Sequence, residues 1–189
     1  PRDRVERVAP WLTLDGNVYP SIVDGRVVWI VDGYTSTAGY PNSQISQMAT
    51  STSDSTTVNR RAVTSLEQGQ VNYIRNSVKA TVDAFDGSVN LYQWDEADPI
   101  LKAWMGAFPG VVRPLSDISA SLMSHLRYPE DLLKIQRQLL ARYHVTDPGT
   151  LFNGQANWRV PSDPTLESRN TDQPAYYLSI CLLYTSPSP

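Results

Sequence analysis

Three acidic residues stand close together in the middle of the chain, directly after two aromatic residues. Asp95, Glu96 and Asp98 follow Tyr92 and Trp94. Paired carboxylates can act as general acid and base in glycoside hydrolysis, and aromatic rings beside them can stack on a sugar. We therefore take the three carboxylates as candidate catalytic residues and the two aromatic residues as candidate binding residues.

A simpler interpretation competes with this one. Asp98 directly precedes Pro99, and an acidic N-cap followed by proline is a typical start of a helix. In that interpretation Asp98 caps the helix, while Asp95 and Glu96 are solvated loop residues. Strand-end carboxylates are also found in calcium sites. The Ca²⁺-binding EF-hand pattern fails just upstream, because centring it on Asp86-Gly87 places Val82 and Gln93 at its first and last ligand positions.

The sequence predicts no metal site and no cofactor. His125 and His144 lie near the ends of predicted helices, and neither has a second His or Cys at metal-ligand spacing. We expect both to act as polar or cationic groups at helix C-termini. The single cysteine, Cys181, excludes an internal disulfide. No G-x-S-x-G nucleophile motif occurs.

The charge pattern argues against nucleic-acid binding. The 16 basic and 19 acidic residues are interleaved and give a formal net charge of -3. The longest basic run, Arg60 and Arg61, has only two residues, whereas a nucleic-acid site needs a basic stripe with aromatic platforms. Apolar runs such as 27–31 are far shorter than the roughly 20 residues of a membrane helix.

Two β-hairpins are predicted in the first half of the chain. In 19–34, β-branched and aromatic residues flank Asp24-Gly25, a dipeptide that favours a type I′ turn. A second hairpin pairs 79–85 with 89–94 around Asp86-Gly87. Residues 72–85 could also form a short helix, but their β-branched content favours a strand.

The second half of the chain is predicted to hold about three helices. They begin at Pro99, near Asp117 and at Pro129. The second is expected to end near 126, and Asp147-Pro148-Gly149 is expected to end the third. In the third helix we expect an apolar buried face and a solvated face, the latter formed by Lys134, Arg137 and Arg142. After Asp147-Pro148 the chain is predicted to be irregular, with Trp158 and Val160 packed beneath it. The fold class is therefore α+β, antiparallel hairpins packed with helices.

One domain is expected over 1–179. Within it, 35–70 is rich in Ser and Thr, has no helical or strand period, and is predicted to be a loop or insert. Residues 180–189 form a short Pro/Ser-containing string that is predicted to be non-native, in which case Cys181 has no functional meaning.

Several sequence blocks resemble uncharacterised protein family 0182 (UPF). They are V-A-P-W-L-T-L-D-G from Val8, V-W-I-V-D-G-Y-T from Val28, N-Y-I-R-N-S-V-K-A from Asn72, Y-Q-W-D-E-A-D-P-I-L-K-A-W from Tyr92, and H-L-R-Y-P-E-D-L-L-K-I-Q from His125. The resemblance implies a bacterial, multi-span membrane protein in which this chain is a fragment of the large extracytoplasmic region. The parent would meet the membrane through helices outside this fragment. No reaction, cofactor or catalytic residue is implied.

We expect an accessory or binding role at the cell envelope. The alternative is an envelope enzyme acting on a glycan or lipid-linked substrate, with the carboxylates as acid and base and the aromatic residues as a stacking wall. A binding module in which the Ser/Thr-rich segment closes over a ligand is a third interpretation.

Overall fold

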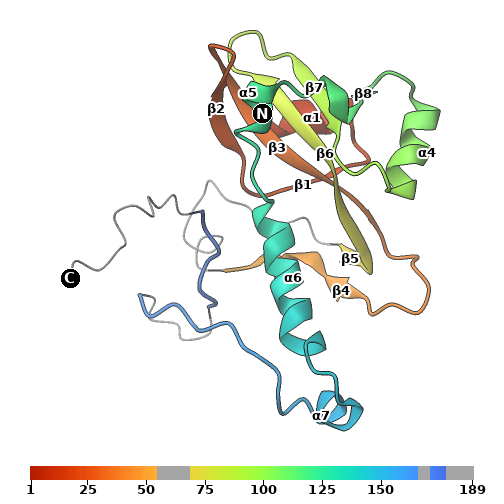
Figure 1. The fold of residues 1–189 in the computed structure, drawn as a ribbon, viewed down its shortest axis with the longest axis vertical. Helices are drawn as coiled ribbons and strands as arrows, with labels where there is room; N and C mark the ends of the chain where they lie inside the picture. Colours follow the sequence, from red (N-terminus) through yellow and green to blue (C-terminus); the bar gives the residue numbers. More distant parts are fainter. Residues whose placement is uncertain (55–68, 166–170, 178–189) are drawn as a thin grey trace.

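The computed structural model describes residues 1–54, 69–165 and 171–177 and confirms the α+β class. These residues form a six-stranded mixed sheet (Figure 1). The strand order is β1-β3-β6-β7-β8, with β2 also paired to β3, and every pair is antiparallel except β7 with β8. The strands are β1 (Thr13–Leu14), β2 (Tyr19–Val23), β3 (Arg26–Thr37), β6 (Tyr73–Asp83), β7 (Val89–Gln93) and β8 (Val112–Arg113).

Both predicted hairpins are present. Asp24 and Gly25 have positive φ angles of 49° and 78°, as a type I′ turn requires, and they join β2 to β3. The second hairpin joins β6 to β7, and its Gly87 also has a positive φ, of 73°. The alternative helix over 72–85 is wrong, because β6 pairs on both sides, with β3 and β7.

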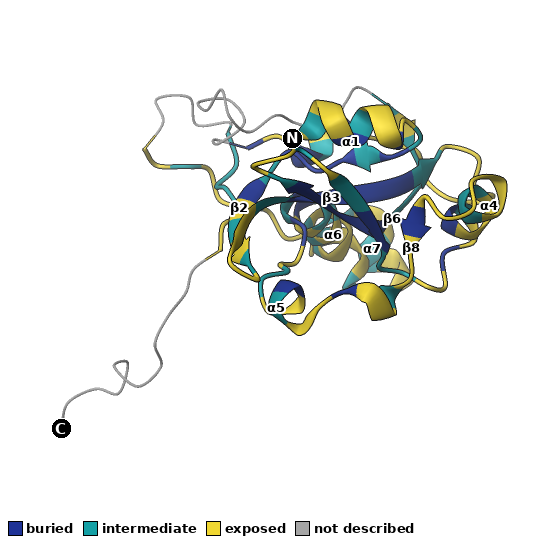
Figure 2. Ribbon diagram, turned by 90° about the horizontal axis from the view of Figure 1, so that it is seen from above, coloured by how far each residue is buried: buried dark blue, intermediate teal, exposed yellow. Residues whose placement is uncertain are grey.

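The sheet lies between two layers of helices. Along β6, Val78, Ala80 and Val82 face a core that is completed by α1 (Arg2–Val8) and α4 (Pro99–Ala107). Neighbouring side chains in a strand point to opposite faces, so Lys79 points to the other layer. Figure 2 shows the buried strands β3 and β6 between α1 on one side and α5 (Ala120–Met123) on the other.

The helix predicted over 117–126 is much shorter than expected. A 3₁₀ turn, η1 (Leu115–Asp117), comes first, and Ser119 then caps α5 by accepting a hydrogen bond from the Leu122 N–H. Ile118 and Leu122 are buried against Tyr19 and Ile30. The apolar repeat therefore marked buried positions correctly, but the cap at Ser119 places Ile118 before the helix.

The long helix α6 (Glu130–Tyr143) begins where predicted, but it ends before Asp147 and has a different buried face. Lys134, which we expected in solvent, is fully buried, whereas Leu139, Leu140 and Tyr143 are about half exposed. Figure 1 shows the reason: α6 runs down beyond the sheet, so its second half lacks the sheet as a packing partner.

In the described parts of the predicted loop, 35–54 and 69–70, the chain forms strands and a short helix. The strand β3 runs to Thr37, and β4 (Ser46–Gln47), α2 (Met48–Thr52) and β5 (Gln70–Val71) follow. β4 pairs with β5, and Met48 packs on Tyr34. Residues 55–68 lie outside the described part of the chain.

The region after α6 also differs from the prediction. A short helix, α7 (Pro148–Asn153), follows Asp147, which caps it. Trp158 is 59% exposed rather than packed beneath the chain, although its ring stacks on His144 at 3.9 Å between centroids. Cys181 and the predicted tail over 180–189 lie outside the described residues. In the described ranges, none of the helices has the length and apolarity needed to cross a membrane.

Candidate functional site

Asp98 is a buried structural residue in this fold. Its carboxylate accepts hydrogen bonds from the backbone N–H groups of Ile100 and Leu101, as an N-cap does. The hydroxyl groups of Ser77, Thr35 and Tyr73 also donate to it, at 2.6, 2.5 and 2.8 Å.

These contacts set the protonation state of Asp98. Burial alone would raise its pKa, but the hydrogen bonds from Ser77, Thr35 and Tyr73 outweigh burial and hold the pKa below its usual value. A general acid needs the opposite shift. The geometry therefore favours the capping interpretation of Asp98 over the catalytic one.

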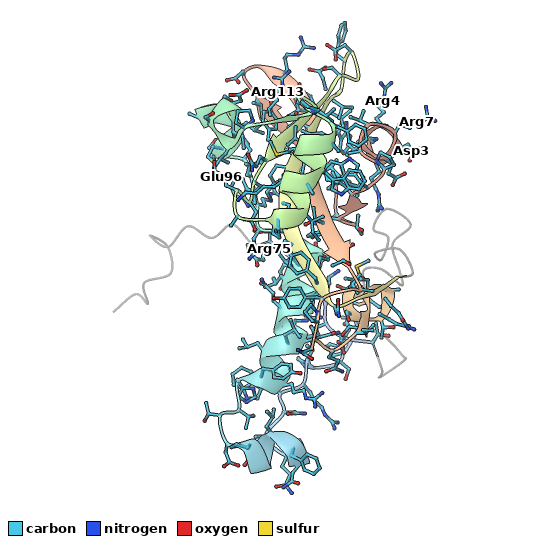
Figure 3. The ribbon with its side chains drawn as sticks, turned by 90° about the vertical axis from the view of Figure 1, so that its right-hand side faces the viewer. Asp3, Arg4, Arg7, Arg75, Glu96 and Arg113 are labelled. Carbon is cyan, nitrogen blue, oxygen red and sulfur yellow. The ribbon has the colours of Figure 1, made fainter. Side chains whose placement is uncertain are left out.

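Asp95 and Glu96 have separate surroundings. Asp95 forms an ion pair with Arg75 at 3.0 Å and accepts a hydrogen bond from the Ala97 N–H. Glu96 is exposed, and Figure 3 shows it on the opposite side of the ribbon from Arg4. Asp95 lines a cleft, and neither Glu96 nor Asp98 is part of the lining of that cleft.

The two candidate aromatic residues also lie in different environments. Tyr92 is buried in the core beneath α5, together with Ile30 and Leu122, so it has little ring surface for a ligand. Trp94 is half-buried and lines the same cleft as Asp95. The Lys79 ammonium lies 5.2 Å from the centre of the Trp94 ring, in cation–π contact.

The cleft has a volume of about 590 Å³ and lies between the sheet and the start of α6. β6 contributes Arg75, Asn76 and Lys79 to one wall, near the point where Figure 3 shows Arg75 above α6. The opposite wall includes Arg127 and Tyr128, from the connection between α5 and α6. This volume is typical of small-molecule sites.

Lys79 and Asp32 form a buried ion pair behind the cleft. The Lys79 ammonium binds the Asp32 carboxylate and donates to the backbone carbonyl of Arg127 at 2.8 Å. Burial raises the pKa of Asp32 to about 6, although the charge of Lys79 opposes this shift. The pair therefore connects β3 and β6 to the segment that carries Arg127.

Arg127 is positioned by both its backbone and its side chain. Its backbone N–H donates to the Tyr19 hydroxyl at 3.1 Å, and its guanidinium lies over the Tyr19 ring at 4.5 Å. The ring of Tyr177 lies near the same guanidinium, at 5.6 Å. Within the described part of the chain no carboxylate forms an ion pair with Arg127, so its N–H edges can receive an anion.

A second buried polar cluster joins the sheet to α6. Lys134 binds the carboxylates of Asp54, Glu130 and Asp131 at 2.9, 3.0 and 3.4 Å. The Asp131 carboxylate also accepts from the Gly16 N–H, and Asp15 accepts from the Asp131 N–H. The hydroxyl of Tyr34 donates to Asp15 as well.

This acidic environment shifts the ionisation of its members. Burial raises the pKa of Asp131 to about 7, and the charge of Asp15 adds to the shift. Burial also raises the pKa of Tyr34, again with help from Asp15. Burial would lower the pKa of Lys134, but the carboxylates of Asp54, Asp131 and Glu130 outweigh it and raise the pKa.

The sequence patterns did not identify the two buried lysines, Lys79 behind the cleft and Lys134 in this cluster, as partners of buried carboxylates. The sequence feature that could have indicated their burial is a charged residue inside an apolar stretch. Lys79 interrupts a strand rich in β-branched residues, and Lys134 lies between Leu132 and Ile135. A lysine in such a place is buried only when it is paired. No group of three or more His, Cys, Asp or Glu suited to a metal ion occurs in the described ranges.

Comparisons with known proteins identify the chain's relatives. A UPF0182 protein of Kineococcus radiotolerans is 57% identical over 185 residues, which cover 95% of this chain and 18% of the relative. A UPF0182 protein of Streptomyces coelicolor is 57% identical over 182 residues, which cover 95% of this chain and 18% of the relative. A UPF0182 protein of Bifidobacterium longum is 56% identical over 184 residues, which cover 95% of this chain and 17% of the relative.

The chain therefore spans less than a fifth of the length of these curated relatives. No solved structure shows significant similarity to it. A family model described as "Uncharacterised protein family (UPF0182)" matches residues 1–187. Given this match along almost the whole chain and the closely similar bacterial relatives, the chain belongs to the uncharacterised protein family UPF0182.

Proposed function

We propose that this chain is a ligand-binding, accessory region on the extracytoplasmic side of a membrane protein. The observation that carries the binding role is the cleft between β6 and the α5–α6 connection. It combines aromatic surface from Trp94 and Tyr128 with the guanidinium of Arg127, whose backbone is fixed by the buried Lys79. A few convergent polar groups in a concave, partly apolar site are typical of small-ligand recognition.

The cleft supports binding better than hydrolysis. Glycoside hydrolysis generally uses two carboxylates that flank the scissile bond. In the described part of the chain, Asp95 is the single carboxylate in the cleft lining, and Arg75 is already paired with it. The envelope-enzyme alternative would therefore need a second carboxylate from elsewhere in the parent protein.

The membrane location rests on the family resemblance and on the length of the relatives. This chain covers only 18% of the Kineococcus radiotolerans relative, so most of that relative's polypeptide lies outside the matched region. We propose that this chain's parent protein has a corresponding remainder and that the membrane-spanning helices belong to it. Fractionation of cells that express the full-length protein tests this location: the protein should be recovered with membranes, and recovery in the cytosol would contradict the proposal.

Binding is tested with soluble peptidoglycan fragments and hydrolysed envelope polysaccharide as probes. We expect either probe to raise the unfolding temperature of the full-length protein. A Trp94→Ala substitution should abolish the shift, because it removes one aromatic wall. A Trp158→Ala control, whose ring lies outside the cleft, should keep the shift. No shift with either probe, or an equal shift in both variants, would contradict a binding role for the cleft.

A further inference from the structure

The charge balance of the cleft indicates the kind of ligand it takes. The cleft lining contains three cations, Arg75, Lys79 and Arg127, and one carboxylate, Asp95. The charge of Lys79 is neutralised by Asp32, which lies outside the cleft lining, and the charge of Arg75 is neutralised by Asp95. Three positive and two negative charges leave a net charge of +1 in a chain whose formal net charge is -3. The site therefore favours an anion, and Arg127 carries the uncompensated charge.

The backbone and the guanidinium of Arg127 are preorganised for anion binding by contacts within the protein. Its backbone is held by the Lys79 ammonium and the Tyr19 hydroxyl, and the Tyr19 ring supports one face of the guanidinium. Stacking on the ring leaves the N–H edges in the guanidinium plane, where two of them can donate to both oxygens of a carboxylate. Little side-chain entropy remains to be lost on binding.

The remaining lining suits a ring that carries hydroxyl groups. Tyr128 is 47% exposed, and its hydroxyl bonds to Gln136, which steadies the ring. Together with Trp94 it offers apolar aromatic faces, while the Arg75–Asp95 pair and Gln136 retain free donor and acceptor positions. A sugar ring has an apolar C–H face and a polar rim, and so matches this distribution.

We propose that the cleft binds an acidic sugar, a pyranose that carries a carboxylate, with Arg127 as the anion-binding residue. The aromatic residues Trp94 and Tyr128 contact the apolar face of the sugar, and the Arg75–Asp95 pair binds its hydroxyl groups. This inference rests on the proposed binding role and specifies the ligand of that same cleft.

Calorimetric titration of the full-length protein with D-glucuronate, D-glucose, acetate and inorganic phosphate tests the proposal. We expect glucuronate to bind at least about tenfold more tightly than glucose or acetate, because only glucuronate uses both the guanidinium and the aromatic faces. Phosphate should bind more weakly than glucuronate, since it has no ring to stack. Affinity for glucuronate should fall as salt concentration rises.

Substitutions of Arg127 locate the anion. Arg127→Gln should weaken glucuronate binding about tenfold and leave glucose binding unchanged, and Arg127→Lys, which keeps the charge without the planar fork, should have an intermediate effect. Arg113→Gln is the matched control, because Arg113 is an exposed arginine outside the cleft (Figure 3). Thermal unfolding of each variant checks that it folds.

The outcomes separate the two proposals. Equal binding of glucose and glucuronate, tighter binding of phosphate, or an unchanged glucuronate affinity in folded Arg127→Gln protein would overturn the acidic-sugar assignment while leaving a binding cleft. If none of the four probes binds and the envelope fragments also fail to bind, the binding role itself is overturned. If only the envelope fragments bind, the acidic-sugar assignment alone fails.

Discussion

The backbone N–H of Gly16 donates a hydrogen bond to the carboxylate of Asp131 over 2.8 Å, although 115 residues separate the two. The Asp131 N–H in turn donates to Asp15 at 3.1 Å. This reciprocal pair fixes the first turn of α6 against the end of β1. Since the α5–α6 connection carries Arg127 and directly precedes this turn, the same contact also helps to position one wall of the cleft.

Replacement of Lys134 should destabilise the fold severely. In Lys134→Met protein, the buried carboxylates of Asp54, Glu130 and Asp131 would lose their shared cation. Breaking a buried ion pair in this way costs about 3–5 kcal/mol. Urea unfolding should show this loss as a lower midpoint. The exposed Lys102, changed to Met, is the control and should alter stability by less than about 0.5 kcal/mol. Similar midpoints for the two variants would show that the cluster contributes little.

Stability should decrease as the pH rises from about 4 to about 7. The pKa of Asp131 is raised to about 7 and that of Asp32 to about 6, so the folded state retains protons that the unfolded state releases above about pH 4. Each retained proton lowers the free energy of unfolding by up to about 1.4 kcal/mol per pH unit across its window.

Chemical denaturation at several pH values measures this slope. The Asp131→Asn variant should show a flatter profile between pH 6 and 7. In this interval Asp131 retains more of its proton than Asp32, which is already about half deprotonated at pH 6, so Asp131 contributes most of the slope. A wild-type profile that rises through this interval would contradict the raised pKa of Asp131.

Two Asp-Pro helix caps should differ strongly in their contribution to stability. Asp98→Ala removes a carboxylate that is fully buried and bonded to Thr35, Ser77 and Tyr73, so it leaves buried donors without their acceptor. We expect a loss of roughly 3 kcal/mol or more. Asp147→Ala removes only an exposed cap and should cost clearly less. Equal losses in thermal unfolding would mean that the hydroxyl contacts of Asp98 contribute nothing beyond capping.

Two glycines should respond to alanine in opposite directions. Gly87 has a φ of +73°, a conformation that is unfavourable for alanine, and Gly87→Ala should destabilise the β6–β7 hairpin by about 1 kcal/mol. Gly106 lies in α4 with open space around its α-carbon, so Gly106→Ala should stabilise the protein by up to about 1 kcal/mol. The prediction fails if calorimetry gives both variants the same sign.

Elements defined by local chemistry could be predicted from the sequence. The Asp24-Gly25 turn and the Asp98 cap before Pro99 lie where their residue types indicated. Both depend on backbone preferences and contacts within a few residues, which neighbouring sequence alone determines. Of the five candidate site residues, Asp95 and Trp94 line the cleft. Tyr92 and Asp98 are buried instead, and their spacing in the sequence gave no sign of this difference.

The sequence by itself therefore determined the α+β class, the two hairpins, the start of α6 and the family resemblance. Only the tertiary structure decided that Lys134 is buried, that Asp98 is a shared acceptor, and that Arg127 and Trp94 line one cleft. The physical reason is that these relationships join groups far apart in the chain, and a charged side chain is buried only when folding brings its partners to it.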